Sequence, residues 1–165
     1  MTRPSGTGTP LAGTTIVVTR PADQAGDLVD GLRAKGAVVV PLAVTAIEPV
    51  DFAVEQADPS SFDWVVFTSA NGVRHFVGRP DGPPRFGSAS VAAVGPGTAD
   101  ALAAVGLAPD LVASVHTATG LCEELVAAEP AGGRALVPQA EAARPTLVDG
   151  LRAAGWTVEP LTVYR

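Results

Sequence analysis

Two parts of this 165-residue chain share one pattern. The heptapeptide Leu-Val-Asp-Gly-Leu-Arg-Ala occurs at residues 28–34 and again 119 positions later at residues 147–153, and both copies are followed at equal spacing by glycine, valine and a Pro-Leu pair. At the same offset, the apolar residues 15–19 fall on residues 134–138. Each copy reads as an apolar strand, an amphipathic helix and a second strand. The repeat therefore predicts two copies of one strand-helix-strand unit.

Strands and helices also alternate between the two copies. The expected strands are residues 15–19, 37–42, 64–67, 91–94, 110–113, 134–138 and 156–164. Alternation with short connections favours a parallel sheet with helices on both faces. We therefore predict an α/β fold with a flavodoxin-like, doubly wound parallel sheet, in which one domain is complete and a second is partial.

The expected domain boundaries follow from the repeat and from changes in composition. We predict a disordered leader over residues 1–12, a partial first domain over 13–45, a linker over 46–61, and a complete second domain over 62–165 that ends in a return linker strand. Two parallel strands and one helix leave an apolar face uncovered, so the first unit is expected to be incomplete and to be able to self-associate through that face.

Charge and hydropathy exclude several classes of partner. The net charge is −6, only 17% of residues are charged, and Lys and Arg do not cluster, whereas binding a phosphate backbone requires clustered cations. The longest apolar runs are too short to span a bilayer, and residues 1–10 lack the apolar core of a signal peptide. We therefore expect a cytoplasmic protein that binds neither nucleic acid nor membrane.

The residues that usually bind metals are scarce. The chain has one cysteine, Cys122, and two histidines, His75 and His116, with no metal-ligand spacing among them. We expect no metal site and no intrachain disulfide. No basic residue lies near Cys122 in sequence, which favours a buried structural thiol over a nucleophile.

One glycine-rich turn is close to the dinucleotide fingerprint. Residues 95–100 read Gly-Pro-Gly-Thr-Ala-Asp, and the third glycine or alanine of the fingerprint is replaced by Asp100, whose carboxylate would repel a pyrophosphate. The turn after the first strand, residues 19–22, reads Thr-Arg-Pro-Ala, which is neither the hydroxyl- and glycine-rich phosphate loop of a flavin site nor the acidic pair of a phosphate receiver. No cofactor is expected.

Three expected helix starts at the same edge of the sheet carry small or hydroxyl residues, at residues 68–71, 95–98 and 117–120. The carboxyl ends of parallel strands share one edge of the sheet, and ligands of open α/β sheets bind there. Backbone N–H groups and the helix dipole make helix starts favourable for anions. The same residues are also the ordinary helix caps. Together the three starts indicate a ligand that carries several carboxylates.

Two further side chains are candidates at this edge. Arg20 directly ends the first strand, and it could contact a ligand or be a solvated surface residue. Tyr164 is the only tyrosine and therefore the only phenolic acid of the chain. A tyrosine at a strand end is otherwise a packing residue with its hydroxyl in water.

The order and spacing of the motifs resemble the uroporphyrinogen-III synthase family. The segments that carry the resemblance are residues 19–21, 67–73, 94–99, 120–121 and 163–164. The resemblance implies two flavodoxin-like domains joined by a two-stranded linker, with the first domain built from both ends of the chain. It also implies a lyase of haem biosynthesis that closes the open tetrapyrrole hydroxymethylbilane with inversion of its D ring, through a spiro intermediate and without cofactor or metal.

The resemblance also implies roles for individual residues. Tyr164 matches the tyrosine proposed to assist departure of the substrate hydroxyl. Thr68, Ser69 and Asn71 match the turn that lines the cleft, and Gly97 and Thr98 match the second helix start. Arg20 matches the first-domain side. Thr119, at the third helix start, is also expected to bind substrate.

Family members continue past the Val-Tyr pair, so a truncated synthase is expected. The alternative is a non-catalytic remnant that binds a polycarboxylate or docks on a partner.

Overall fold

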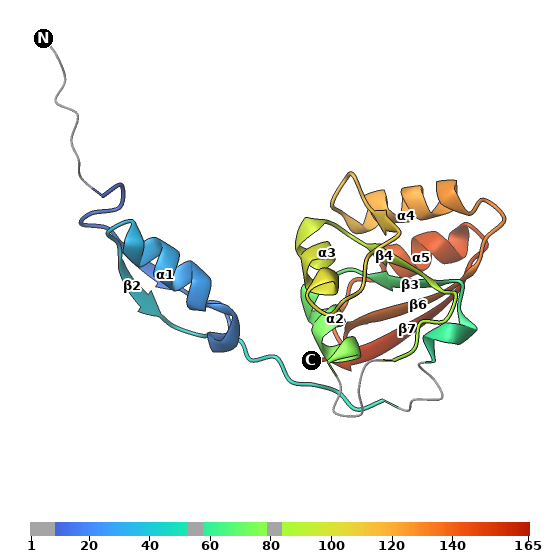
Figure 1. Ribbon diagram of the computed structural model, residues 1–165, viewed down its shortest axis with the longest axis horizontal. Helices are drawn as coiled ribbons and strands as arrows, with labels where there is room; N and C mark the ends of the chain where they lie inside the picture. The colour runs from blue at the N-terminus through green and yellow to red at the C-terminus, as the bar shows by residue number, and fades with distance from the viewer. Residues whose placement is uncertain (1–8, 53–57, 79–83) are drawn as a thin grey trace, which may run out of the picture. The chain divides into compact units, whose positions relative to one another are not determined.

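The computed structural model describes residues 9–52, 58–78 and 84–165 and divides into two compact units, residues 1–47 and 48–165 (Figure 1). Most of the expected leader and part of the expected linker lie outside the described residues. Residues 9–12 differ from the expectation of a disordered leader, because they form a turn in which the Leu11 N–H donates to the Lys35 carbonyl (2.8 Å).

The first unit is a single strand-helix-strand unit. Strand β1 (Thr15–Val18) leads into a 3₁₀ turn (Ala22–Gln24) and helix α1 (Gly26–Ala34), and β2 (Val38–Pro41) then pairs with β1 in parallel. Gly36 ends the helix with a φ of 90°, a left-handed conformation that side chains disfavour. The small core consists of Val18, Ala25, Val29, Ala37 and Val39.

The second unit contains a five-stranded parallel sheet in the order β5-β4-β3-β6-β7. Its elements are β3 (Trp64–Phe67), α2 (Ala70–Val77), β4 (Ser90–Ala93), α3 (Pro96–Ala103), β5 (Leu111–Val112), α4 (Ala118–Ala128), β6 (Arg134–Ala140), α5 (Thr146–Ala153) and β7 (Thr157–Tyr164). The predicted α/β class with parallel strands is confirmed.

The strand order departs from the flavodoxin arrangement. Counted from β3, the observed order is 3-2-1-4-5, whereas flavodoxin has 2-1-3-4-5. The reason lies in the crossovers: β5 continues outward beyond β4, and β6 then pairs with the free edge of β3. The direction of winding therefore reverses between β3 and β6, which is where open α/β sheets form their ligand crevice.

Side chains of the central strands alternate between two apolar cores. Val65 and Phe67 pack with helices α2 and α3, and Val66, between them, packs with α4 and α5 on the other face (Figure 1). All three are fully buried. Burial on both faces explains the uninterrupted apolar run of β3.

The repeat seen in the sequence is also present in the strand register. Thr15 pairs with Val38 in the first unit, and Arg134 pairs with Thr157, each 119 positions later, in the second. The repeated apolar residues nevertheless differ in exposure. Val17, Leu42 and Val44 are 53%, 56% and 65% exposed. Their counterparts Leu136, Leu161 and Val163 are 0%, 7% and 0% exposed, because they pack in the core that includes α2.

The chain enters the second unit beside its last strand. Glu48 and Arg165 exchange two backbone hydrogen bonds of 2.9 Å, the Val50 N–H donates to the Val163 carbonyl (3.0 Å), and Pro49 forms an antiparallel bridge with Tyr164. The end of β7 is therefore held on both sides. Within the described ranges, no helix has the length and apolarity needed to cross a membrane.

Candidate functional site

The first helix start of the sheet edge is built by Ser69. Its backbone is extended (φ −159°), and its Oγ accepts the N–H of Gly72 (3.0 Å), so Ser69 is the N-cap of α2. A cap satisfies one of the four N–H groups that every helix start leaves without an intrahelical partner. The capping interpretation of this turn is thus confirmed for Ser69. Thr68 precedes it, partly exposed, at the end of β3.

The Ser69 hydroxyl has a second partner, the hydroxyl of Tyr164. The two oxygen atoms are 3.2 Å apart, across 95 positions of the chain, and either atom can donate. Both side chains are partly buried. Two residues expected at the site are therefore in direct contact, one at the start of α2 and the other at the end of β7.

A shift in strand register brings Tyr164 to this face of the sheet. Gln139 pairs with Thr162, but Ala140 pairs with Tyr164, so Val163 is an extra residue in β7. Without the shift, Val163 and Tyr164 would point to opposite faces, because side chains alternate along a strand. In the structure both pack against the core formed with α2. Bulges commonly redirect a side chain next to a functional site.

A histidine on α2 completes this group. The ring of His75 stacks on that of Tyr164, with centroids 5.5 Å apart and an interplanar angle of 27°. In the sequence, His75 is notable only as one of two histidines without metal-ligand spacing. The sequence places His75 on the helix that follows Ser69. No pattern in the neighbouring residues indicates that its ring contacts the end of β7.

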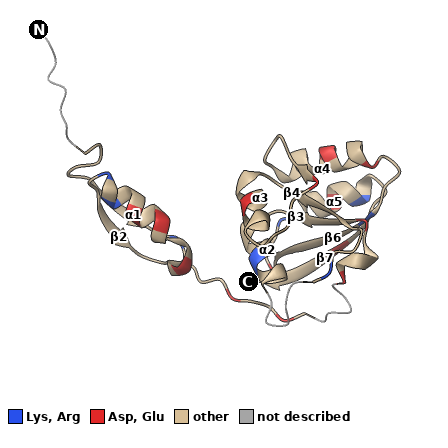
Figure 2. Ribbon diagram, in the orientation of Figure 1, with Lys and Arg blue, Asp and Glu red and all other residues tan. Residues whose placement is uncertain are grey.

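Gly72 is another residue that the sequence patterns did not single out, and it sets how closely α2 approaches the sheet. A Cβ added to Gly72 would lie 2.9 Å from the carbonyl oxygen of Pro138 in β6. The first turn of α2 therefore rests directly on the β6 backbone, at the reversal point between β3 and β6. Asn71, in the same turn, accepts a hydrogen bond from Arg74 (3.0 Å), which places one cation beside this helix start. Figure 2 shows a basic segment on α2.

The second helix start follows β4, the neighbour of β3. Gly97 is exposed in the first turn of α3, whereas Thr98 is 5% exposed and belongs to the interior. Gly95 lies against the ring of His116, since an added Cβ would be 3.0 Å from its Cγ. His116 is exposed and is thus a second histidine at this edge.

The third helix start lies on the other side of the sheet, because α4 packs with α5 rather than with α2 and α3. Its N-cap is Thr117, whose Oγ1 accepts the N–H of Gly120 (3.1 Å), while the expected ligand residue Thr119 is exposed in the first turn. The three starts share the carboxyl edge of the five-stranded sheet. This edge is about 19 Å wide, because neighbouring strands are about 4.8 Å apart. The start that meets Tyr164 is that of α2.

Two ionisable groups on α4 have shifted pKa values. Hydrogen bonds from the Ser114 hydroxyl (2.7 Å) and N–H (2.8 Å) lower the pKa of Glu124. Burial, and then the charge of Glu123, raise the pKa of Cys122. A raised thiol pKa opposes thiolate chemistry. Cys122 is expected to be buried and is partly buried in the structure.

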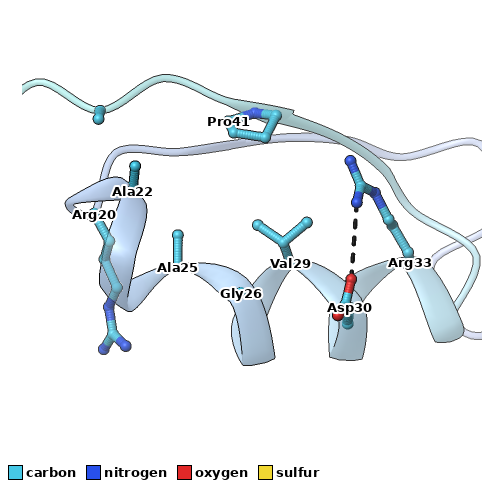
Figure 3. Close-up of a pocket in the computed structure, with 9 residues that line it drawn as sticks. Arg20, Ala22, Ala25, Gly26, Val29, Asp30, Arg33 and Pro41 are labelled. Carbon is cyan, nitrogen blue, oxygen red and sulfur yellow. Dashed lines mark ion pairs between the residues drawn. The ribbon is translucent and has the colours of Figure 1, made fainter.

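Arg20 belongs to the first unit and lines a pocket of about 430 Å³ there (Figure 3). Small and apolar residues, Ala22, Ala25, Val29 and Pro41, form much of its wall, and the Arg20 guanidinium extends away from Pro41. The pocket lies beside the carboxyl ends of β1 and β2. Among the residues that the structure describes, no group of three or more His, Cys, Asp or Glu side chains could hold a metal ion.

A parallel sheet with helices on both faces and polar helix starts at its carboxyl edge places the chain among the open α/β proteins, whose ligands bind outside the strand ends. A family model described as uroporphyrinogen-III synthase HemD matches residues 26–165. The chain belongs to the uroporphyrinogen-III synthase family.

Individual relatives agree with this assignment. The chain is 32% identical over 166 residues to a uroporphyrinogen-III synthase of Synechococcus elongatus, covering 94% of this chain and 61% of that protein. It is 28% identical over 169 residues to the porphyrin biosynthesis protein HemD of Ruminiclostridium josui, covering 94% of this chain and 32% of that protein. The chain thus spans less than two thirds of these relatives.

A solved structure shares the fold. The uroporphyrinogen III synthase of the extremely thermophilic bacterium Thermus thermophilus, as a selenomethionine mutant, superimposes with a TM-score of 0.63 at 23% identity, over 93% of this chain and 62% of that one. A second crystal form, of the wild-type enzyme, gives a TM-score of 0.57.

Proposed function

We propose that this chain acts in haem biosynthesis as a uroporphyrinogen-III synthase, a lyase that converts hydroxymethylbilane to uroporphyrinogen III with inversion of the D ring. The observation that carries the proposal is the contact between Tyr164 and Ser69 at the strand reversal point, in a chain of this family. A cytoplasmic location and a small tetrapyrrole as the only substrate are part of the proposal.

Tyr164 is the proposed acid. The Ser69 oxygen already accepts the Gly72 N–H, so its own proton is available to the Tyr164 oxygen. When Ser69 is the donor, the phenolic proton of Tyr164 is left for donation to a substrate. Donation of this proton to the terminal hydroxyl of the bilane releases water and leaves a carbocation-like methylene for attack by the D ring. The resulting phenolate oxygen would accept a hydrogen bond from the Ser69 hydroxyl, which itself accepts the Gly72 N–H at the positive end of the α2 dipole.

The carboxylates of the substrate are proposed to bind along the sheet edge. The starts of α2 and α3 offer backbone N–H groups and helix dipoles, and Arg74 and His116 add cationic or hydrogen-bonding side chains beside them. Thr68, Asn71 and Gly97 belong to the same proposed wall. Thr119, in the first turn of α4, is proposed to reach the ligand from the other face of the sheet. Arg20 is proposed as a ligand contact of the first unit. Thr98 is left out of this wall, because its side chain is interior and its N–H donates to the Gly95 carbonyl (3.1 Å). Catalysis in this scheme rests mainly on positioning.

A second candidate is a non-catalytic protein that binds a polycarboxylate or associates through its first unit. The observation in its favour is the exposure of Val17, Leu42 and Val44, whose repeated counterparts are covered. Such an apolar surface is typical of an interaction site.

A coupled assay with freshly prepared hydroxymethylbilane distinguishes the two candidates. The spontaneous reaction yields the type-I isomer, so formation of the type-III isomer in proportion to the amount of protein supports the synthase. Only the type-I isomer, at the rate without protein, would reject catalysis by this chain. Binding of uroporphyrin measured by fluorescence titration would then support the second candidate, and its absence would reject polycarboxylate binding as well.

A further inference from the structure

The stacked pair of His75 and Tyr164 has no counterpart among the motifs that define the resemblance. His75 lies in the second turn of α2, partly buried, and its ring covers one face of the phenol at 5.5 Å. The other end of the phenol, its hydroxyl, contacts Ser69 at the first residue before the same helix. Helix α2 therefore contacts Tyr164 at two points, the ring face and the hydroxyl.

We propose that His75 is a positioning residue for Tyr164, holding the phenol ring so that its hydroxyl stays at the N-cap of α2. The consequence for turnover rests on the synthase activity proposed above. The consequence for the ring itself does not, because it concerns only the conformation of Tyr164.

The backbone of Tyr164 cannot supply this positioning by itself. Pairing with residues 48–50 and with β6 fixes the strand end, but a tyrosine side chain still has two rotatable bonds. The Ser69 contact restrains only the hydroxyl, at 3.2 Å and partly exposed to water. A planar partner on the face of the ring limits rotation about the second of these bonds, which joins Cβ to the ring. Aromatic pairs at this separation prefer offset-stacked or edge-to-face arrangements, and the interplanar angle of 27° is that of a stacked pair.

The position of His75 on the helix suits this role. Gly72 sets the helix against the Pro138 carbonyl, and Ser69 caps it, so the histidine is carried by a helix that is itself fixed on the sheet. The same rigid element therefore carries both contacts to the phenol. What the stack on Tyr164 requires at position 75 is a planar side chain.

The test uses the fact that Tyr164 is the only tyrosine of the chain, so its ring protons form a single assignable set in NMR spectra. His75→Leu and His75→Gln are expected to weaken the nuclear Overhauser contacts between the Tyr164 ring protons and the Ser69 methylene protons, which loss of the imidazole ring current alone would leave intact, whereas His75→Phe retains these contacts. Circular dichroism checks that each variant folds. Two non-aromatic variants are used so that the test still stands if one of them fails to fold. His116→Leu, at the other histidine, is the control and should leave these contacts unchanged.

In the bilane assay, His75→Leu is expected to lower kcat roughly tenfold to a hundredfold with little change in KM, as for a misplaced catalytic group, and His75→Phe is expected to restore it. Unchanged contacts between Tyr164 and Ser69 in both non-aromatic variants would overturn the proposal. Loss of kcat in a His75→Phe protein that keeps the stack would overturn it as well, since the imidazole would then do more than position. A wild-type chain that makes no type-III isomer would reject the synthase, while the NMR signals would still decide the role of His75.

Discussion

The Tyr164 hydroxyl lies 3.2 Å from the Ser69 oxygen that caps helix α2, so one hydroxyl both stabilises a helix and contacts the proposed catalytic acid. The cap and the site are therefore not competing interpretations of this turn. Variants that separate the two roles are the most informative.

Ser69→Ala should lose both roles. We expect a fall of about 1 kcal/mol in the free energy of unfolding, as for other caps, together with a lower rate of type-III isomer formation. Urea denaturation and the coupled assay measure the two effects. Thr117→Ala is the matched control, because Thr117 caps α4 through the same hydrogen bond to a glycine N–H, on the opposite side of the sheet from Tyr164. An equal loss of activity in both variants would show that only stability is involved.

Tyr164→Phe should keep the ring and remove the acid. The stack on His75 is retained, so stability should change by about 1 kcal/mol or less, the usual contribution of a single hydrogen bond. Type-III isomer formation should fall at least 10²-fold, within the range that general acid catalysis contributes. Product isomers separated by chromatography measure this. A variant with full activity would rule out Tyr164 as the acid.

Gly72→Ala should destabilise the protein and displace the start of α2. The added Cβ would lie 2.9 Å from the Pro138 carbonyl oxygen, and backbone atoms move little, so we expect a loss of about 1–3 kcal/mol in unfolding free energy. Gly97→Ala is the control for helix propensity, because nothing lies within 4 Å of its added Cβ. Alanine should be neutral or slightly stabilising there. Similar unfolding curves for the two variants would contradict the close approach seen at Gly72.

The hydrogen bonds from Ser114 should make Glu124 a pH-dependent contributor to stability. Its pKa is lowered below the ordinary value of 4.5 in the folded state, so the contribution is present above pH 4.5 and is lost as the pH falls through the lower folded value. Ser114→Ala should therefore raise the Glu124 pKa toward 4.5, measured by carboxyl ¹³C NMR titration. An unchanged titration curve would show that the hydroxyl hydrogen bond is not the main cause.

The exposed face of the first unit should determine any self-association. If copies associate there, sedimentation will show a mass that rises with concentration, and Val17→Glu combined with Leu42→Glu should abolish the increase. Val105→Glu, at an exposed apolar residue of the second unit, is the control. A monomer at every concentration would reject self-association.

Much of the fold follows from local patterns. The apolar runs predicted all seven strands of the described residues to within a few positions, and the repeat predicted the two strand-helix-strand units, which the structure shows in a common register. Those features depend on side-chain periodicity within single elements, which a sequence displays directly. The strand order was not predictable in this way, because outward and returning crossovers have the same local pattern.

The sequence by itself determined the α/β class, the duplicated unit, and the placement of hydroxyl residues at helix starts. Only the tertiary structure decided which of those residues meet. The extra residue in β7 turns Tyr164 toward α2, the β3-β6 pairing brings that strand end close to Ser69, and the packing of α4 on the opposite face separates Thr119 from both. Each of these depends on contacts between residues far apart in the chain, and their free energy is not encoded in any single segment.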